Sequence, residues 1–219
     1  MTVQKEIDQN KVIAICRRIY GEDLYRLADA LGRGGIRLME ITFDQADPDC
    51  IAKTTQAIHM LADKFEDRLL AGAGTVLTKE QVKAALDAGA HYIISPNVDV
   101  EVISYSKELG LISIPGAMTP SEIITAHKAG ADFVKLFPSG TLGFSYIKDI
   151  LAPISHVRLV ATGGVTEDTL SQYLDLGFAG AGVSGRLADR KLIKEGNFEE
   201  IENRARAFMS IVDKYTVKA

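Results

Sequence analysis

One lysine of the 219-residue chain lies inside an apolar run, where its chemistry would differ from that of a surface lysine. Lys135 follows Phe133 and Val134 and precedes Leu136 and Phe137. Such neighbours would deprive the ammonium group of water, and this loss lowers the pKa of a lysine. An unprotonated amine can attack a ketone and form a Schiff base. The alternative is a strand-edge lysine whose stem covers apolar surface while its charged end reaches water.

A glutamate occupies a similar apolar run earlier in the chain. In a strand, Leu38, Glu40 and Thr42 would share one face, because successive side chains alternate between the two faces. A carboxylate on a buried strand can act as a general acid and base beside a lysine, each group shifting the pKa of the other. The alternative for Glu40 is a structural ion pair with Lys135 or Arg17.

Arg17 continues the inward face of the first predicted strand, after Ile13 and Ile15. A guanidinium at this position suits two-point binding of a substrate carboxylate. Arg18 would point the other way, and we expect it to be a solvated residue.

Two glycine-containing segments late in the chain predict a phosphate site. Thr162, Gly163 and Gly164 precede a predicted helix that begins near Glu167, and the second segment is Gly182-Val183-Ser184-Gly185. Glycines leave backbone N–H groups accessible, Ser184 adds a hydroxyl, and the start of a helix favours an anion. The alternative is that these glycines serve only the turns.

Short apolar runs that alternate with amphipathic stretches must position these side chains. Glycines end five of the amphipathic stretches, at positions where a helix commonly stops with a positive φ; they are Gly35, Gly89, Gly110, Gly130 and Gly177. The patterns predict strands at Val12–Cys16, Arg37–Ile41, Leu69–Ala71, Tyr92–Ile94, Ile112–Ile114, Phe133–Leu136, Arg158–Ala161 and Ala179–Val183. The clearest helical patterns are Glu22–Leu31, Pro48–Lys64, Lys79–Ala88, Pro120–Ala129 and Glu199–Lys214, with Asp47, Thr78 and Thr119 as caps. We also expect a short helix at Val3–Asn10, ahead of the first strand.

Eight βα units in a chain of this length predict a (β/α)8 TIM barrel with a short N-terminal helix, as a single domain over residues 1–219. No linker or low-complexity segment divides the chain. The alternative is an open doubly wound sheet, but that fold normally has a glycine-rich first turn, and here the first strand ends in CRRIYGED. In a barrel the predicted site residues would meet at the carboxyl ends of the strands.

The composition and net charge of the chain exclude several classes of binding partner. Lys and Arg number 25 against 29 Asp and Glu, a net charge of −4, and no basic run would attract nucleic acid. No apolar stretch resembles a signal peptide or a membrane span, and two cysteines suit a reducing cytoplasm. No cluster of ligand residues at the predicted strand ends indicates a metal, and the Gly72-Ala73-Gly74-Thr75 turn lacks the rest of a dinucleotide-binding motif.

From Lys11 to Phe208 the chain resembles the class I aldolases that act on 2-keto-3-deoxy-6-phosphogluconate (KDPG) or 4-hydroxy-2-oxoglutarate (KHG). The motifs that carry the resemblance are Glu40-Ile41-Thr42, Gly72-Ala73-Gly74-Thr75-Val76, Ile94-Ser95-Pro96, Pro115-Gly116 followed by Met118-Thr119-Pro120, Val134-Lys135-Leu136-Phe137-Pro138, Thr162-Gly163-Gly164-Val165 and Ser184.

The resemblance implies a homotrimeric, metal-free barrel enzyme of Entner–Doudoroff metabolism that cleaves KDPG to pyruvate and glyceraldehyde 3-phosphate. It implies that Lys135 forms the Schiff base without any cofactor and that Glu40 moves protons. The substrate-binding residues that it implies are Arg17, Thr42 and Thr75 on the carboxylate side, Pro96 and Phe137 in the apolar wall, and Thr162, Gly163, Gly164 and Ser184 on the phosphate side.

One position departs from the family. Some members have an arginine just after the second strand, where this chain has Asp44. We expect Arg17 to supply the missing positive charge and Asp44 to belong to the turn before the next helix. Two other functions stay open: a phosphate-binding barrel isomerase or decarboxylase in which Lys135 is only an electrostatic clamp, and a non-catalytic trimeric barrel.

Overall fold

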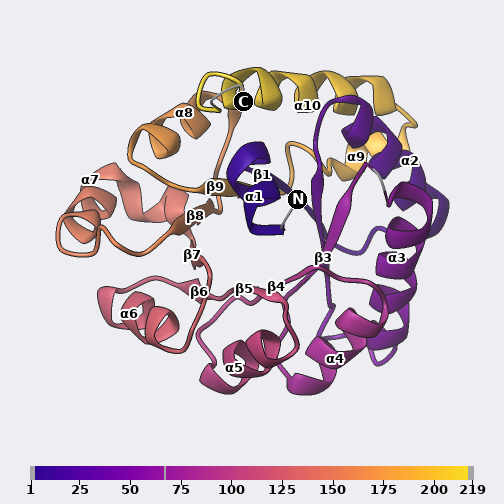
Figure 1. Ribbon diagram of the computed structural model, residues 1–219. Helices are drawn as coiled ribbons and strands as arrows, with labels where there is room; N and C mark the ends of the chain where they lie inside the picture. Colours follow the sequence, from indigo (N-terminus) through magenta and orange to yellow (C-terminus); the bar gives the residue numbers. More distant parts are fainter. Residues whose placement is uncertain (1–2, 67, 217–219) are drawn as a thin grey trace.

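In the computed structural model, which describes residues 3–66 and 68–216, nine parallel strands form one curved sheet inside a ring of helices (Figure 1). Their order in the sheet is β5-β4-β3-β2-β1-β9-β8-β7-β6. The strands are β1 (Val12–Cys16), β2 (Leu38–Thr42), β3 (Leu70–Gly74), β4 (Tyr92–Ile94), β5 (Ile112–Ile114), β6 (Gly116–Ala117), β7 (Val134–Leu136), β8 (Leu159–Thr162) and β9 (Gly180–Val183).

The ninth strand, β6, is the continuation of β5 beyond Pro115. Pro115 has no N–H to donate, so the run is interrupted there. The first half pairs with β4, and the second half pairs with β7, where the Lys135 N–H donates to the Pro115 carbonyl oxygen at 2.8 Å. One continuous segment therefore joins the two ends of the sheet and closes the predicted eight-position TIM barrel.

Apart from the first helix, which precedes β1 and lies in the middle of the ring, the helices of the described residues follow the strands and cover the outside of the barrel (Figure 1). Their bounds are α1 (Val3–Asn10), α2 (Gly21–Arg33), α3 (Cys50–Phe65), α4 (Lys79–Asp87), α5 (Val100–Glu108), α6 (Pro120–Lys128), α7 (Ser139–Leu151), α8 (Glu167–Asp175), α9 (Arg190–Lys194) and α10 (Phe198–Val212).

The predicted helix starts are confirmed at Thr78 and Thr119, whose side chains accept hydrogen bonds from the first turns of α4 and α6. The predicted start at Pro48, with Asp47 as cap, is wrong. The Asp47 side chain instead accepts from the N–H of Asp49 at 2.9 Å, in a turn that delays the start of α3 to Cys50.

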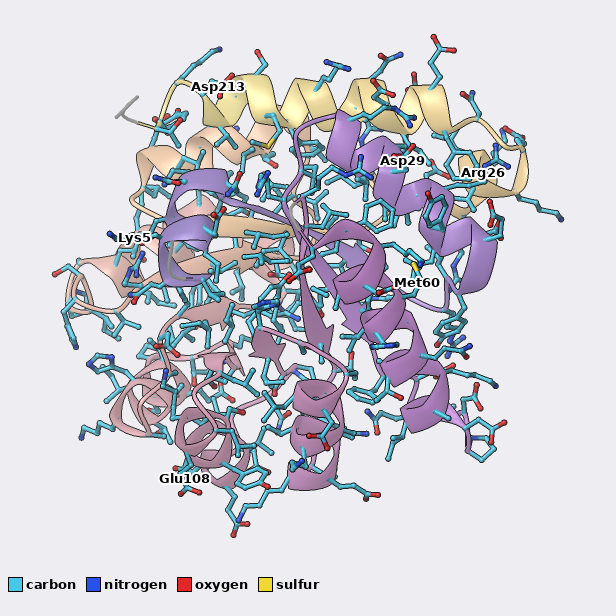
Figure 2. All side chains as sticks on the ribbon, turned by 45° about the vertical axis from the view of Figure 1, so that its right-hand side comes forward. Lys5, Arg26, Asp29, Met60, Glu108 and Asp213 are labelled. Atoms are coloured by element: carbon cyan, nitrogen blue, oxygen red, sulfur yellow. The ribbon has the colours of Figure 1, made fainter. Side chains whose placement is uncertain are left out.

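Two apolar layers follow from the alternation of side chains along the strands. The larger cluster lies between strands and helices, and Figure 2 shows charged side chains such as Glu108 and Asp213 at the outer edge of that helical layer. The smaller cluster fills the barrel interior, and Ile7 of α1, the helix in the middle of the ring in Figure 1, belongs to it. Its buried members are Ile7, Ile13, Leu38, Tyr92, Ile94, Ile114, Phe133 and Val160.

All five glycines that were predicted to end helices have positive φ angles, between 78° and 97°. The repeat of helix, glycine and strand that the sequence predicts is therefore confirmed in the structure. It places the carboxyl ends of the strands, and the residues that follow them, at one end of the barrel.

Candidate active site

Lys135 and Glu40 both point into the barrel from the middle of their strands. Lys135 is 5% exposed on β7, and Glu40 is 2% exposed on β2. In the sheet order, β1, β9 and β8 separate these two strands, so the side chains extend from opposite walls. The structure therefore places an amine and a carboxyl group in the same enclosed space.

Burial shifts both groups toward their uncharged forms. Desolvation lowers the pKa of Lys135, opposed by the negative charge of Glu40 and assisted by the positive charge of Arg17. Desolvation raises the pKa of Glu40, opposed by the charges of Lys135 and Arg17. A lysine more readily deprotonated, beside a carboxyl group more readily protonated, is suited to nucleophilic attack and proton transfer.

The carboxyl group of Glu40 has room only because residue 74 is glycine. A Cβ on Gly74 would lie 1.9 Å from Glu40 Oε1, closer than any two non-bonded atoms can approach. Glu40 Oε2 is buried without a hydrogen-bond partner in the described part of the chain. An unsatisfied buried oxygen at the base of a site is free to exchange a proton with a bound molecule.

Gly72 makes room for the Tyr92 ring, because its Cβ would lie 2.1 Å from that ring. Their positions at a strand end predict that Gly72 and Gly74 clear space for a ligand, and the structure corrects this prediction. Both positions accommodate side chains of the barrel wall, and the Gly74 position acts on the site only through Glu40.

A cavity of about 290 Å³ lies at the carboxyl ends of β1, β7, β8 and β9, and neither Lys135 nor Glu40 is among its lining residues. It contains six of the predicted binding residues, namely Arg17, Phe137, Thr162, Gly163, Gly164 and Ser184, together with Ile15, Val165, Thr166, Gly182, Gly185 and Arg186. Lys135 Nζ lies 5.0 Å from the centroid of the Phe137 ring, which connects the buried amine to this cavity.

Ser139, which sequence reasoning missed, fixes the position of the Thr162 end of β8. Its hydroxyl oxygen lies 3.0 Å from the Leu136 carbonyl oxygen and 2.9 Å from that of Thr162, and it accepts a hydrogen bond from the Thr162 N–H at 2.7 Å. The N–H of Gly140 donates to the Gly163 carbonyl at 2.8 Å. The start of α7 thus holds the glycine turn in place. Only the position of Ser139, after Phe137 and Pro138, could have indicated this role.

Thr42, Thr75 and Pro96 lie outside the lining of this cavity. Thr42 is buried, and its hydroxyl donates to the Cys16 carbonyl at 3.4 Å. Thr75 has a positive φ of 54°, and its carbonyl accepts a hydrogen bond from the side chain of Gln45 at 2.7 Å. Their assignment as substrate-binding residues stays a prediction.

Asp44 is paired with Arg18, whose side chain is 59% exposed, so the expected solvated position of Arg18 is confirmed and the ion pair is an addition to it. Arg18 Nε lies 2.6 Å from Asp44 Oδ2, and Arg18 Nη2 donates to Oδ1 at 2.9 Å. The hydrogen bond from Arg18 holds the pKa of Asp44 below its usual range. The charge of Asp44 is therefore compensated by Arg18, which leaves Arg17 available to the cavity.

The described residues contain no group of three or more His, Cys, Asp and Glu side chains that could hold a metal ion. Metal independence stays a prediction. Within residues 3–66 and 68–216, no helix has the length and apolar character needed to cross a membrane.

A closed parallel barrel with a buried amine and carboxyl group inside it, and a cavity at the carboxyl ends of its strands, defines a TIM-barrel enzyme suited to carbonyl chemistry. Comparison with known proteins gives the family. The family model for KDPG and KHG aldolases matches residues 3–204. The chain belongs to this aldolase family, whose members are carbon–carbon lyases.

Three similar proteins illustrate the relation. The 2-dehydro-3-deoxy-6-phosphogalactonate aldolase of Escherichia coli K12 is 37% identical over 80% of this chain and 83% of its own. The 2-dehydro-3-deoxy-phosphogluconate aldolase of Haemophilus influenzae is 30% identical over 95% of both chains. The crystal structure of KDPG aldolase from Legionella pneumophila, with pyruvate captured as a covalent carbinolamine, has a TM-score of 0.83 at 28% identity and covers 94% of this chain and 98% of that chain.

Proposed function

We propose that the protein cleaves KDPG to pyruvate and glyceraldehyde 3-phosphate through a Schiff base on Lys135. The observation that carries this proposal is that Lys135 and Glu40 are buried inside the barrel and that the Phe137 ring, 5.0 Å from Lys135 Nζ, lines a cavity together with Gly163, Gly164 and Ser184. Lys135 and Glu40 can react with the carbonyl end of a 2-keto acid. Gly163, Gly164 and Ser184 can bind a phosphate at its other end.

The reaction begins when Lys135 Nζ attacks C2 of the keto acid and forms a carbinolamine, which loses water to give a protonated imine. The imine withdraws electrons from C3. Removal of the proton from the C4 hydroxyl then breaks the C3–C4 bond and releases glyceraldehyde 3-phosphate. The remaining enamine is protonated at C3, and water hydrolyses the imine to pyruvate and free Lys135.

Glu40 is the group that we assign to these proton transfers. Desolvation raises its pKa and so favours the protonated carboxyl group, and its buried Oε2 has no hydrogen-bond partner in the described part of the chain. Arg17 and Thr75 would bind the C1 carboxylate, Thr42 would support that side, and Pro96 and Phe137 would form the apolar wall.

The relatives support this chemistry and add a second substrate. The carbinolamine in the Legionella enzyme is the adduct that an amine forms with pyruvate. The Escherichia coli relative is named for the galactonate isomer, which differs from KDPG at C4. We therefore propose KDPG as substrate, with the C4 epimer and KHG as the competing substrates to compare.

The test is pyruvate release, followed by a coupled dehydrogenase, from KDPG, its C4 epimer, KHG and unphosphorylated 2-keto-3-deoxygluconate. The expected result is the highest kcat/KM for a phosphorylated substrate. Release of pyruvate from none of the four would contradict the proposal and favour the isomerase or the non-catalytic barrel.

We also propose a homotrimer that works in the cytoplasm without a metal ion. The two cysteines support a reducing compartment, because Cys16 and Cys50 are both free thiols. Light scattering of the purified protein should give three times the mass of one chain, and turnover should persist after treatment with a chelator. A monomer, or a loss of activity restored by a divalent cation, would contradict these proposals.

A further inference from the structure

An arginine that neither the sequence motifs nor the proposed chemistry uses lines the phosphate side of the cavity. Arg186 follows β9 and lies in the cavity wall with Thr166 and Ser184. Its side chain is 47% exposed, so it is not enclosed in the core. The guanidinium is therefore accessible to a molecule in the cavity.

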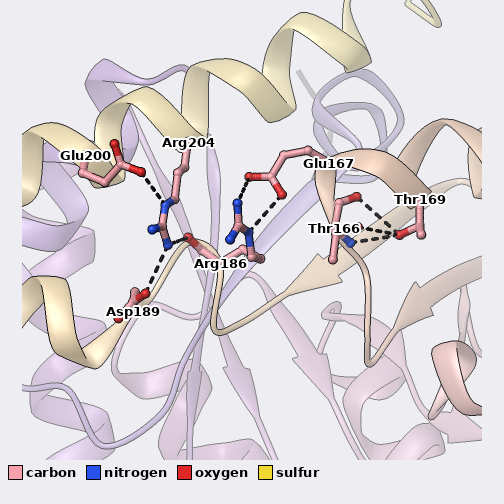
Figure 3. Close-up of polar contacts among 7 residues, drawn as sticks. All are labelled: Thr166, Glu167, Thr169, Arg186, Asp189, Glu200 and Arg204. Atoms are coloured by element: carbon pink, nitrogen blue, oxygen red, sulfur yellow. Dashed lines mark hydrogen bonds and ion pairs between the residues drawn. The ribbon is translucent and has the colours of Figure 1, made fainter.

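Glu167, the first residue of α8, holds this guanidinium by two hydrogen bonds (Figure 3). Arg186 Nε donates to Glu167 Oε2 at 3.0 Å, and Nη2 donates to Oε1 at 2.8 Å. A guanidinium has five N–H groups in a fixed plane, so three remain for another acceptor. The paired geometry fixes the direction in which those three point.

The backbone of Arg186 is held from the opposite side by α10. Arg204 donates from Nη1 to the Arg186 carbonyl at 3.4 Å and to Asp189 Oδ2 at 3.1 Å, and from Nε to Glu200 Oε1 at 2.8 Å (Figure 3). Because Arg204 is only 19% exposed, these contacts are partly shielded from water. The loop after β9 is thus supported on both sides of Arg186.

The charges around the cavity require such an arginine if a phosphate binds there. The first turn of α8 contains Glu167 and Asp168, two carboxylates at the helix end that faces the glycine turn. Uncompensated, they would repel a dianion and cancel the favourable field of the helix start. Arg186 offsets the charge of Glu167 and still presents N–H donors.

We propose that Arg186, oriented by Glu167, is a specificity-determining residue that selects substrates with a phosphate at the end remote from the keto group. The assignment rests on the proposed aldol cleavage. It adds a charge-based selection to the glycine turn and Ser184, which offer only uncharged donors.

The experiment compares Arg186→Gln, Arg186→Lys and Glu167→Gln with the wild type on KDPG and on unphosphorylated 2-keto-3-deoxygluconate. Arg186→Gln should lower kcat/KM for KDPG about 10- to 100-fold, mainly through KM, because hydrogen bonds to charged groups have this magnitude. It should leave the unphosphorylated substrate nearly unchanged. Arg186→Lys should restore part of the loss, since it keeps the charge without the two-point contact.

Glu167→Gln separates a charge effect from a structural one. It removes the carboxylate charge but keeps an amide oxygen that can accept a hydrogen bond from Arg186, so Arg186 stays oriented and kcat/KM for KDPG should be retained or raised. If both single variants lower kcat/KM for both substrates alike, the pair only supports the loop and the proposal is overturned. Arg206→Gln is the matched control, because Arg206 forms an Arg–Glu pair with Glu202 on α10 and lies outside the cavity lining.

Failure of the proposed aldol cleavage gives a different result from failure of the role proposed for Arg186. A wild-type enzyme that cleaves neither substrate would contradict the aldolase reaction, and calorimetric titration with inorganic phosphate would then test Arg186 alone. Weaker phosphate binding by Arg186→Gln than by the wild type and Arg206→Gln supports the proposal, and equal binding overturns it.

Discussion

Replacing Gly74 by alanine should remove most of the activity while leaving the fold intact. The new Cβ would lie 1.9 Å from Glu40 Oε1, 2.5 Å from Cδ and 2.6 Å from Cγ. Ordinary contact begins at 3.4 Å, so the carboxyl group must move by about 1.5 Å. A displacement of about 1 Å at a reacting group can cost about 100-fold in rate, so we expect kcat to fall by about 100-fold or more.

The effect on stability should be smaller, because the displaced atoms are the end of a side chain and not backbone. Overpacking of this kind typically costs about 1–3 kcal/mol of unfolding free energy, measurable by urea denaturation. Gly32→Ala is the matched control, since nothing lies within 4 Å of the Cβ that it would add on α2. That control should keep the wild-type kcat and gain about 0.5–1 kcal/mol from reduced backbone freedom.

The outcome that would refute the reasoning is a folded Gly74→Ala enzyme with the wild-type kcat. Glu40 would then not need its observed position, and its assignment to proton transfer would fail. Circular dichroism would show whether an inactive Gly74→Ala variant is unfolded. In that case turnover is measured at a lower temperature at which circular dichroism shows the variant to be folded.

Two further predictions concern the charged groups of the site. Glu40→Gln should lower kcat by about 10²–10⁴-fold, the usual contribution of a general acid and base. Glu40→Gln should also raise the free energy of unfolding at neutral pH. The pKa of Glu40 is raised above 4.5 in the folded state, so the wild type loses stability as the pH rises from 4.5 through the folded-state pKa. Urea denaturation at a series of pH values should therefore show a gain in stability for the variant that disappears below that pH range. Arg17→Met should raise the KM for the keto acid, because Arg17 supplies positive charge near both Lys135 and Glu40; unchanged pyruvate affinity, measured by competitive inhibition, would show that the carboxylate is bound elsewhere.

The barrel could be predicted from the sequence because its signals are local. An apolar run and a glycine with positive φ mark each βα unit, and the described strands lie within a few residues of the predicted ones. The division of the fifth strand at Pro115 could not be predicted, since it depends on which neighbour each half pairs with.

The candidate site was predictable where it depends on the face of a strand and less so where it depends on contacts between distant segments. The alternation of side chains placed Glu40 on one face of its strand with Leu38 and Thr42, and the apolar neighbours of Lys135 indicated its burial. The pairing of Arg18 with Asp44 depends on two loops meeting in space, and so does that of Arg186 with Glu167. Residue type also gave no sign that Gly72 and Gly74 accommodate Tyr92 and Glu40.

The central claim is that Lys135 is the nucleophile, and covalent trapping tests it most directly. The wild-type protein is incubated with pyruvate and borohydride, and the modified residue is located by peptide mass spectrometry. The account predicts one reduced pyruvate adduct, on Lys135, which is absent from Lys135→Met. Absence of an adduct from the folded wild-type protein, or an adduct on another lysine, would contradict it.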